Sequence, residues 1–178
     1  MIVMLKNVRL AFPQLFEAKM VNGQGEPKFG ASLIFDNTHP AYKLVSDAIE
    51  EVGKAKWGVK WASEKKAIAA KDKLALHDGD LKAQYAGYEG NYYVSASNKV
   101  RPTVIDRDRS PLTAQDGKPY AGCYVNASIE IWAQDNTFGK GVNASLRGIQ
   151  FSADGEAFSG GGSADADEFD SEEESNLV

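Results

Sequence analysis

Residues 123–132, CYVNASIEIW, alternate apolar and polar side chains with the two-residue period of a β-strand. One face of such a strand carries Cys123, Val125, Ala127, Ile129 and Ile131. The opposite face carries Tyr124, Asn126, Ser128, Glu130 and Trp132. A strand with one apolar and one polar face is typical of a sheet that covers a core on one side and meets water on the other. The alternation therefore predicts a strand over about residues 122–134.

Two further segments repeat this alternation, NYYVSASNKVR (91–101) before the first and VNASLRG (142–148) after it. Their inner faces are predicted to carry Tyr92, Val94, Ala96, Val100, Val142, Ala144 and Leu146. Their outer faces are predicted to carry Tyr93, Ser95, Ser97, Lys99, Arg101, Asn143, Ser145 and Arg147. We therefore expect strands over about 92–101 and 142–151 that share one core with the first.

Two more segments with strand character lie near the N-terminus. Residues 2–12 predict a strand that ends at Pro13, because proline interrupts the hydrogen-bond ladder of a sheet. The inner face of this strand is predicted to carry Val8, Leu10 and Phe12. Residues 28–35 alternate again and predict the next strand.

The middle of the chain has a different periodicity. Apolar residues at helical spacing predict a helix that begins near Pro40 and ends near Gly53. A second helix is expected over about 62–72, and the glycines and aspartates of residues 77–91 indicate a long loop. One or two helices, about five strands and long connections predict a mainly β fold, a small Greek-key barrel with long loops.

The outer faces of the three C-terminal strands combine aromatic rings, small hydrogen-bonding groups and cations. Bases of single-stranded nucleic acid stack on aromatic faces while cations contact the phosphates. The candidate binding residues on these faces are Tyr93, Lys99, Arg101, Tyr124, Trp132 and Arg147. The alternative is that these aromatic rings pack beneath loops and that the serines and asparagines simply face solvent.

A lysine-rich segment supplies further candidates. Trp57, Lys60 and Trp61 lie among many lysines between residues 54 and 73, and helical spacing places the two indoles on one face. One interpretation is a nucleic-acid contact, in which the lysines neutralise phosphates. The other is that the indoles anchor the helix and the lysines form its solvated face.

The sequence offers little for catalysis or metal binding. Zinc sites need about four nitrogen or sulfur ligands, whereas the chain contains only Cys123, His39 and His77 as candidates. We expect no catalytic residues, no metal and no cofactor. The single cysteine excludes an internal disulfide and fits a reducing compartment such as the cytosol. No apolar run approaches membrane length, so no membrane partner is expected.

Charge is distributed unevenly along the 178 residues. The formal net charge is −5, but nine of the 25 acids lie beyond Arg147, where there is no Lys or Arg. Residues 1–147 contain the remaining 16 acids and all 20 Lys and Arg residues, so they carry a formal charge of about +4. A basic body joined to an acidic tail suggests that both interact with one partner, such as a polyanion.

The chain also resembles a phage protein family long catalogued as a domain of unknown function. The resemblance lies in five segments: VRLAFPQLFEA (8–18), PKFGASLIF (27–35), YYVSASNK (92–99), YAGCYVNASI (120–129) and GKGVNASLRGIQ (139–150). Characterised members of that family are single-stranded-DNA-binding proteins with an oligonucleotide-binding (OB) fold. The resemblance implies an OB-fold domain over residues 1–152, followed by a flexible glycine-rich linker and acidic tail over 153–178.

The tail resembles the acidic C-terminal tails of phage and bacterial single-strand binders, which occupy the DNA groove and recruit replication proteins. The residues that this resemblance assigns to partner binding are Asp167, Glu168, Phe169, Asp170, Glu172, Glu173 and Glu174. The chain ends in Leu177-Val178 rather than in the Pro-Phe of bacterial tails, and Phe169 is internal.

The resulting hypothesis is a non-enzymatic protein that binds single-stranded DNA with little sequence preference during phage replication, recombination or repair. RNA stays open as a second ligand, and the sequence does not predict the oligomeric state. The alternative is a virion structural or assembly protein whose acidic tail serves solubility.

Overall fold

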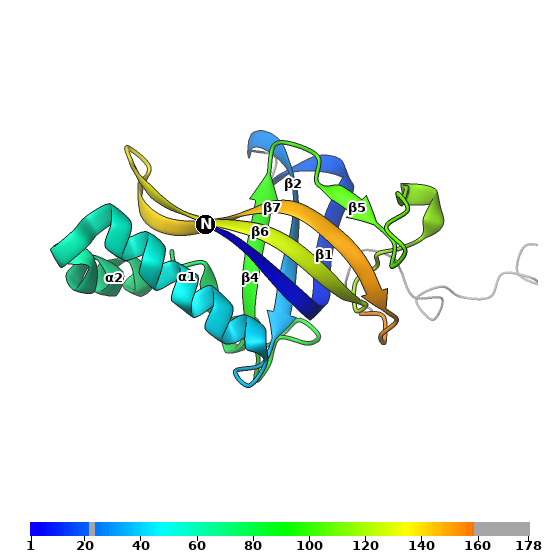
Figure 1. The fold of residues 1–178 in the computed structure, drawn as a ribbon, viewed down its shortest axis with the longest axis horizontal. Coiled ribbons are helices and arrows are strands. Elements are labelled where there is room, and N and C mark those ends of the chain that lie inside the picture. The colour runs from blue at the N-terminus through cyan, green and yellow to red at the C-terminus, as the bar shows by residue number, and fades with distance from the viewer. Residues whose placement is uncertain (22–23, 159–178) are drawn as a thin grey trace, which may run out of the picture.

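The fold of the chain, in a computed structural model that describes residues 1–21 and 24–158, is a closed β-barrel (Figure 1). Its five barrel strands are β1 (Ile2–Val21), β2 (Gln24–Phe35), β4 (Tyr92–Asn98), β6 (Tyr124–Asn136) and β7 (Gly139–Ala153). They are hydrogen-bonded in the order β4-β2-β1-β6-β7, and a parallel pairing of Ser97 with Ser145 joins β7 to β4 and closes the barrel. The predicted mainly β barrel with Greek-key connections is confirmed.

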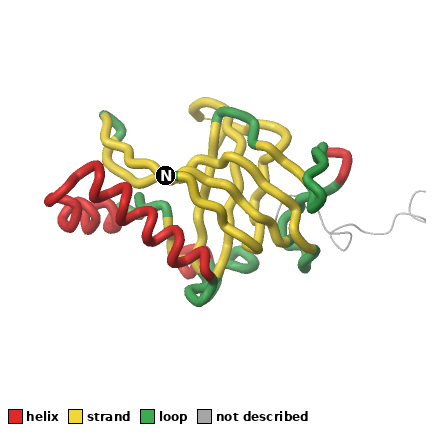
Figure 2. Tube along the Cα trace, viewed as in Figure 1, coloured by secondary structure: helices red, strands yellow, loops and turns green. Residues whose placement is uncertain are grey.

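Shorter elements flank the barrel. Strand β3 (Leu76–Asp78) pairs with β4, and β5 (Thr103–Ile105) runs parallel to β7. The helices α1 (Pro40–Trp57) and α2 (Trp61–Ala70) connect β2 to β3, and 3₁₀ turns cover Gly58–Lys60, Gly79–Lys82 and Ala114–Asp116. Figure 2 shows both helices gathered at the end of the barrel where the β6–β7 hairpin projects.

Helix α1 does not end at Gly53 as predicted, and the reason lies in the packing of the two helices. A Cβ atom on Gly53 would clash with the indole of Trp61, so the glycine permits the close approach between α1 and the start of α2. The helix ends instead at Trp57, before Gly58, which has a positive φ of 57°.

Strand β1 continues through Pro13, contrary to the prediction. The register between β1 and β2 shifts between Ala11 and Gln14, and such an irregularity accommodates a proline within a sheet. Phe12 has a φ of 47° there and leaves the barrel core, where it was predicted to lie. It packs instead against Tyr85 and Tyr88 on the outside of the barrel, with ring centroids 5.1 and 6.2 Å away.

The segment over residues 77–101 also differs from the prediction. The expected long loop contains β3 and the Gly79–Lys82 turn, and β4 ends at Asn98 rather than near residue 101. The Asn98 side chain accepts a hydrogen bond from the Val100 N–H at 3.1 Å, which turns the chain out of the ladder. Val100, predicted to lie in the core, is therefore 70% exposed.

The barrel interior is apolar and carries the face predicted from the alternation of β6 and β7. The large side chains fully buried there include Leu5, Leu10, Leu33, Val94, Val125, Ile129, Ile131 and Leu146. The buried stripe of α1 (Ala41, Val45, Ala48 and Ile49) joins this core. Burial raises the pKa of the Cys123 thiol to about 11, so this cysteine is a core residue rather than a nucleophile.

The chain after β7 packs back on the barrel as far as it is described. The Phe158 N–H donates to the carbonyl of Ala121 at 3.0 Å, and the Arg9 guanidinium lies 4.2 Å from the centre of the Phe158 ring. Residues 154–158, assigned from the sequence to a linker, are thus held against β1 and the segment that precedes β6. The domain boundary at residue 152 stays a prediction, because the glycine-rich linker and the acidic tail lie outside the described residues. Neither α1 nor α2 is both long and apolar enough to cross a lipid bilayer.

Candidate nucleic-acid interface

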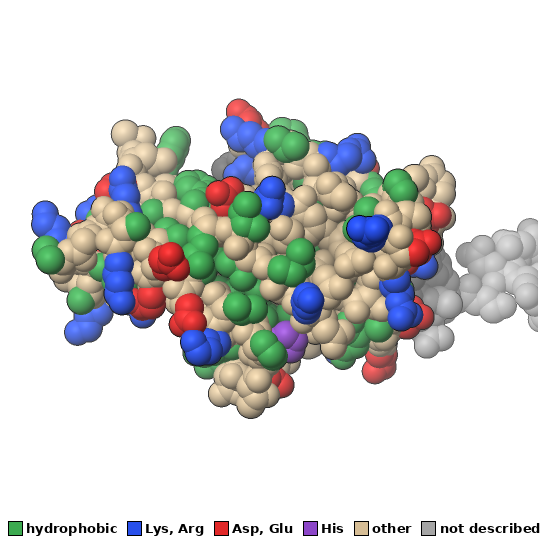
Figure 3. All heavy atoms as spheres, viewed as in Figure 1, with side chains coloured by type: hydrophobic (Ala, Val, Ile, Leu, Met, Phe, Trp, Pro, Cys, Tyr) green, Lys and Arg blue, Asp and Glu red, His purple; other side chains and the backbone are tan. Residues whose placement is uncertain are grey.

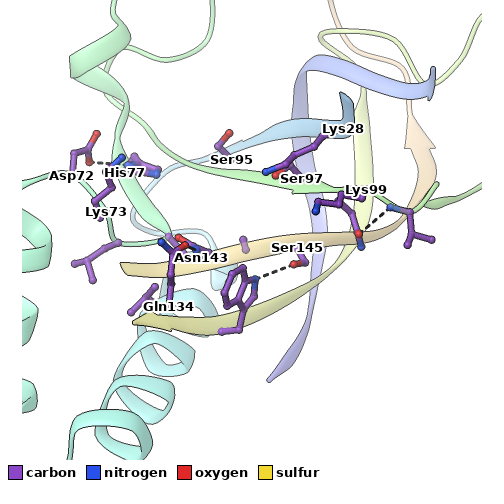
Figure 4. Close-up of a pocket in the computed structure, with 17 residues that line it drawn as sticks. Lys28, Asp72, Lys73, His77, Ser95, Ser97, Lys99, Gln134, Asn143 and Ser145 are labelled. Atoms are coloured by element: carbon purple, nitrogen blue, oxygen red, sulfur yellow. Dashed lines mark hydrogen bonds and ion pairs between the residues drawn. The ribbon is translucent and has the colours of Figure 1, made fainter. Parts of the chain in front are cut away.

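A groove on the barrel has a volume of about 700 Å³ and lies between β4, the β6–β7 hairpin and the segment that follows α2 (Figure 4). Its floor comes from the outward faces of the strands, with Ser95 and Ser97 on one side and Trp132, Gln134, Asn143 and Ser145 on the other. Its rim includes Lys28, Asp72, Lys73, His77 and Lys99. Residues from five separate parts of the chain therefore line one concave surface.

Trp132 is the aromatic platform of this groove. Its side chain is 40% exposed, and its Nε1–H donates to the Ser145 hydroxyl at 2.9 Å across the hairpin (Figure 4). Asn143 donates to Gln134 at 2.7 Å beside it. These hydrogen bonds hold the indole and the neighbouring side chains in place on the hairpin. The exposed face of the indole therefore has little freedom to reorient.

A second groove of about 520 Å³ adjoins the first. The two share Asn98 and Val100 in their linings, so they form a continuous surface along β7. Arg101 and Arg147 are the cations of the second groove, and Met4, Thr103, Asn126, Ser128 and Gln150 are among its other lining residues. Its lining contains no Asp or Glu.

The cations of the grooves differ in how far they are neutralised. Lys99 lies 2.7 Å from a carboxylate oxygen of Glu26, and the hydrogen bond from Lys99 lowers the pKa of Glu26. Arg101 is held over the ring of Phe29 at 5.4 Å, and neither Arg101 nor Arg147 has an ion-pair partner in the described residues. Lys28 and Lys73 of the first groove also have no ion-pair partner in the described residues, so these two lysines and the two arginines provide the uncompensated positive charge.

The comparison with protein families agrees with this geometry. The model of a family described as the single-stranded-DNA-binding protein of Enterobacter phage Enc34 matches residues 1–178. The chain belongs to this family. A relative from Acyrthosiphon pisum secondary endosymbiont phage 1, described as putative protein p50, is 50% identical over 171 residues, which cover 94% of this chain and 92% of the relative.

Solved structures show the same fold. The single-stranded-DNA-binding protein from bacteriophage Enc34 in complex with ssDNA has a TM-score of 0.74 and 26% identity, with 88% of each chain covered. A C-terminal truncation of the same Enc34 protein has a TM-score of 0.74 and 28% identity, again with 88% of each chain covered. The bacteriophage T7 protein gp2.5, with a TM-score of 0.60 and 14% identity over 96% of this chain and 95% of that one, shares the fold. The predicted OB fold and phage family are confirmed.

Among the residues predicted from strand faces, the grooves bring together Lys99, Arg101, Trp132 and Arg147. Tyr93 is a clear exception. It is only 3% exposed, because Tyr88 packs edge-on against it at 5.0 Å and His77 stacks on it at 5.0 Å. Burial raises the pKa of Tyr93 to about 12. The prediction that Tyr93 offers an open stacking face is wrong, and the alternative of packing beneath a loop is correct for this ring.

Tyr124 lies on the same outward face of β6 as Trp132, but toward the opposite end of the strand. Tyr124 and Trp132 are eight residues apart, and a strand rises about 3.3 Å per residue, so about 26 Å of strand separates their backbone positions. Tyr124 contacts neither groove and lies 5.8 Å from the Arg9 guanidinium, near residues 154–158.

The two indoles of the lysine-rich segment anchor the helices. Trp61 is 4% exposed, its Nε1–H donates to Glu50, and its ring stacks on Trp57 at 5.6 Å. Trp57 is half-buried and lies 3.4 Å from Asp135 of the hairpin. Of the two interpretations of this segment, the anchoring of the helix is therefore the correct one for Trp61, whose ring is enclosed. Lys60 is exposed but lines neither groove.

Several groove residues were missed in the sequence, notably Lys28, Lys73, His77 and Gln134. They belong to different elements and come together only because the barrel closes. Asn143 and Ser145 were placed on the correct outward face, but their role beside Trp132 depends on the pairing of β6 with β7. Within residues 1–21 and 24–158, no group of three His, Cys, Asp or Glu residues could hold a metal ion.

Proposed function

We propose that this chain binds single-stranded DNA along the two adjoining grooves. The observation that carries the proposal is the exposed indole of Trp132, fixed by Ser145 and followed along the same surface by Arg101 and Arg147. Bases would stack on the indole, and the arginines would contact phosphates. In OB folds the ligand typically lies on strands two and three and near the loop between strands four and five, which correspond here to β2, β4 and the β6–β7 hairpin.

The groove chemistry favours binding with little sequence preference. The amide groups that could read base edges are paired with each other, Asn143 with Gln134 and Asn126 with Gln150. The remaining contacts are a ring face and cations, which every nucleotide can use. We propose that the protein acts without catalysis, in phage DNA replication, recombination or repair in the host cytoplasm. Family membership favours this function over a virion assembly role.

The proposal is tested by titrating fluorescent oligonucleotides of equal length as single-stranded DNA, duplex DNA and single-stranded RNA across a salt series. Single-stranded DNA should bind at least tenfold more tightly than duplex, because stacking contributes about 1–3 kcal/mol per base and paired bases hide their faces. Equal affinities for the single strand and the duplex at moderate salt would contradict the proposal. The RNA series measures how strongly the grooves discriminate deoxyribose from ribose.

The acidic tail is proposed to modulate DNA access and to recruit replication or recombination proteins. The support is the charge split of the sequence, with about +4 over residues 1–147 and nine acids beyond them. Carboxylates near the grooves would compete with phosphates for Arg101 and Arg147. Charges are screened beyond about 8 Å at physiological ionic strength, so this competition requires close approach.

Deleting residues 164–178 should therefore tighten binding of single-stranded DNA by about two- to tenfold at low salt, and less at high salt. The matched control keeps the tail length and changes its Asp and Glu residues to Asn and Gln, which should tighten binding equally. Phe169→Ala should weaken partner capture with little effect on DNA affinity. If truncation leaves DNA affinity unchanged at both salt concentrations, the tail does not compete for the groove.

A further inference from the structure

His77 lies at one end of the larger groove and takes no part in the stacking mechanism proposed above. It is one of the two histidines of the chain, on the short strand β3. Its Nδ1 atom lies 2.7 Å from a carboxylate oxygen of Asp72, and its ring stacks on Tyr93 with an interplanar angle of 23°. The side chain is 16% exposed. In Figure 4 the ring lies between Asp72 and the rest of the groove. The imidazole is therefore fixed in place at the groove wall.

The contact with Asp72 determines what the other ring nitrogen can do. A carboxylate accepts hydrogen bonds, so Nδ1 carries a hydrogen and donates it to Asp72. In the described residues Nε2 has no hydrogen-bond partner. In the neutral ring Nε2 is an acceptor, and in the protonated ring it is a donor. Phosphate oxygens are acceptors, so only the protonated ring can bond to a DNA phosphate.

The charged groups around the ring favour such a contact. The Asp72 carboxylate lies beside the imidazole, and Lys73 and Lys28 line the same groove and attract phosphate, whereas Lys99, further along, is paired with Glu26. Lys82 lies 5.2 Å from the centre of the Tyr93 ring. Tyr93 itself stays neutral, since its pKa is raised to about 12. The members of the hairpin that line the groove, Trp132, Gln134, Asn143 and Ser145, carry no charge.

We propose that His77 is a proton-dependent phosphate contact of the DNA groove. Protonated His77 binds a phosphate through Nε2, and neutral His77 does not. Histidine is the side chain that ordinarily changes charge between pH 5 and 8, so the contact makes DNA affinity depend on pH in that range. This inference rests on the proposed function, because it assigns a further residue to the same groove.

The test measures the affinity of the full chain for an oligothymidylate at about pH 8 and about pH 5.5, each across a salt series. Thymine gains no proton in this range, so the DNA does not titrate. Because binding takes up a proton, affinity should rise as the pH falls, by about tenfold for one charge-assisted hydrogen bond. The dependence of log affinity on log salt should steepen by about 0.7, as expected for one more neutralised phosphate.

Two variants locate the effect. His77→Gln should lose the pH dependence of DNA affinity. For each protein we compare the ratio of its affinities at the two pH values, so that any overall change in affinity cancels. His39→Asn is the matched control, because His39 caps α1 by accepting the Ala41 N–H at 2.9 Å and lines neither groove. Asparagine also caps helices, so this variant should keep the full pH ratio. All three proteins carry the acidic tail, whose own titration therefore cancels.

A measurement by NMR on the His39→Asn protein, which has a single imidazole, does not require changing His77. The titration midpoint of that imidazole should move to higher pH by about one unit when DNA is bound. A midpoint that stays fixed or moves to lower pH overturns the inference, as does a pH ratio that His77→Gln retains. If the unaltered chain binds no single-stranded DNA at either pH, the proposed function fails as well. If it binds equally at both, only the role of His77 fails.

Discussion

The Trp132→Ala protein is expected to bind a short oligothymidylate about 10- to 100-fold more weakly than the unaltered chain. The reason is that Trp132 is the only Trp, Tyr or Phe among the described residues that line either groove, and losing one stacked base costs about 1–3 kcal/mol. The ring is 40% exposed and packs on the hairpin surface rather than in the core, so the fold should survive its removal. Fluorescence anisotropy gives the affinity, and a thermal melt checks the fold.

Two further variants show whether the ring face is the cause. Trp132→Phe keeps an aromatic face but loses the hydrogen bond to Ser145, and should lie between the alanine variant and the unaltered chain. Tyr124→Ala removes a ring from the same face of β6 outside both grooves, and should bind DNA normally. If Trp132→Ala binds with undiminished affinity, or if Tyr124→Ala causes the larger loss, DNA does not lie along these grooves.

The sequence predicts the barrel well because strand alternation depends on local residue order. Val125, Ala127, Ile129 and Ile131 are all buried as expected, since a two-residue period can place them on only one face of β6. Prediction fails where local order competes with tertiary packing. Pro13 reads as the end of a strand, but a register shift accommodates it within β1.

The binding site is harder to predict than the fold. Tyr93, Tyr124 and Trp132 have equivalent positions in the outward patterns of two strands, yet only Trp132 lies in a groove. The difference arises from segments outside the strands that carry these rings, because Tyr88 in the preceding loop covers Tyr93 and residues 154–158 lie beside Tyr124. Gly53 shows the same dependence on tertiary packing. Its sequence position predicts the end of a helix, but the glycine lies inside α1 and leaves room for the indole of Trp61.

Charge raises a related question, because the sequence contains two cationic regions that contribute unequally to the grooves: of the lysines between residues 54 and 73, only Lys73 lines one. Figure 3, which shows one face of the molecule, has Lys and Arg side chains over both the helical end and the barrel. The lysines of the helices are solvent-exposed, as Lys60 and Lys66 illustrate. Arg101 and Arg147 instead line a groove that contains no acid. Position relative to Trp132, rather than local charge density, should decide which cations bind phosphate.

The double variant Arg101→Gln/Arg147→Gln tests this expectation. Each arginine that contacts a phosphate of a single strand contributes about 0.7 to the slope of log affinity against log salt, so the slope should fall by about 1.4. Affinity at low salt should fall by about 10- to 100-fold, and the loss should shrink as salt rises. Glutamine is preferred to alanine because it removes the charge but keeps part of the aliphatic stem of each arginine. Lys99 is left unchanged, since Glu26 already neutralises it.

The matched control removes the same charge from the helices with Lys60→Gln/Lys66→Gln. Both lysines are exposed and neither lines a groove, so this variant should retain the salt slope of the unaltered chain. Net charge falls equally in the two variants, which separates contact with phosphate from general electrostatic attraction. A normal slope in the arginine variant together with a reduced slope in the lysine variant would move the DNA path from the barrel to the helices. Equal reductions of the slope in both variants would mean that the bound DNA spans the grooves and the helices, because counterions are released only where phosphates are neutralised.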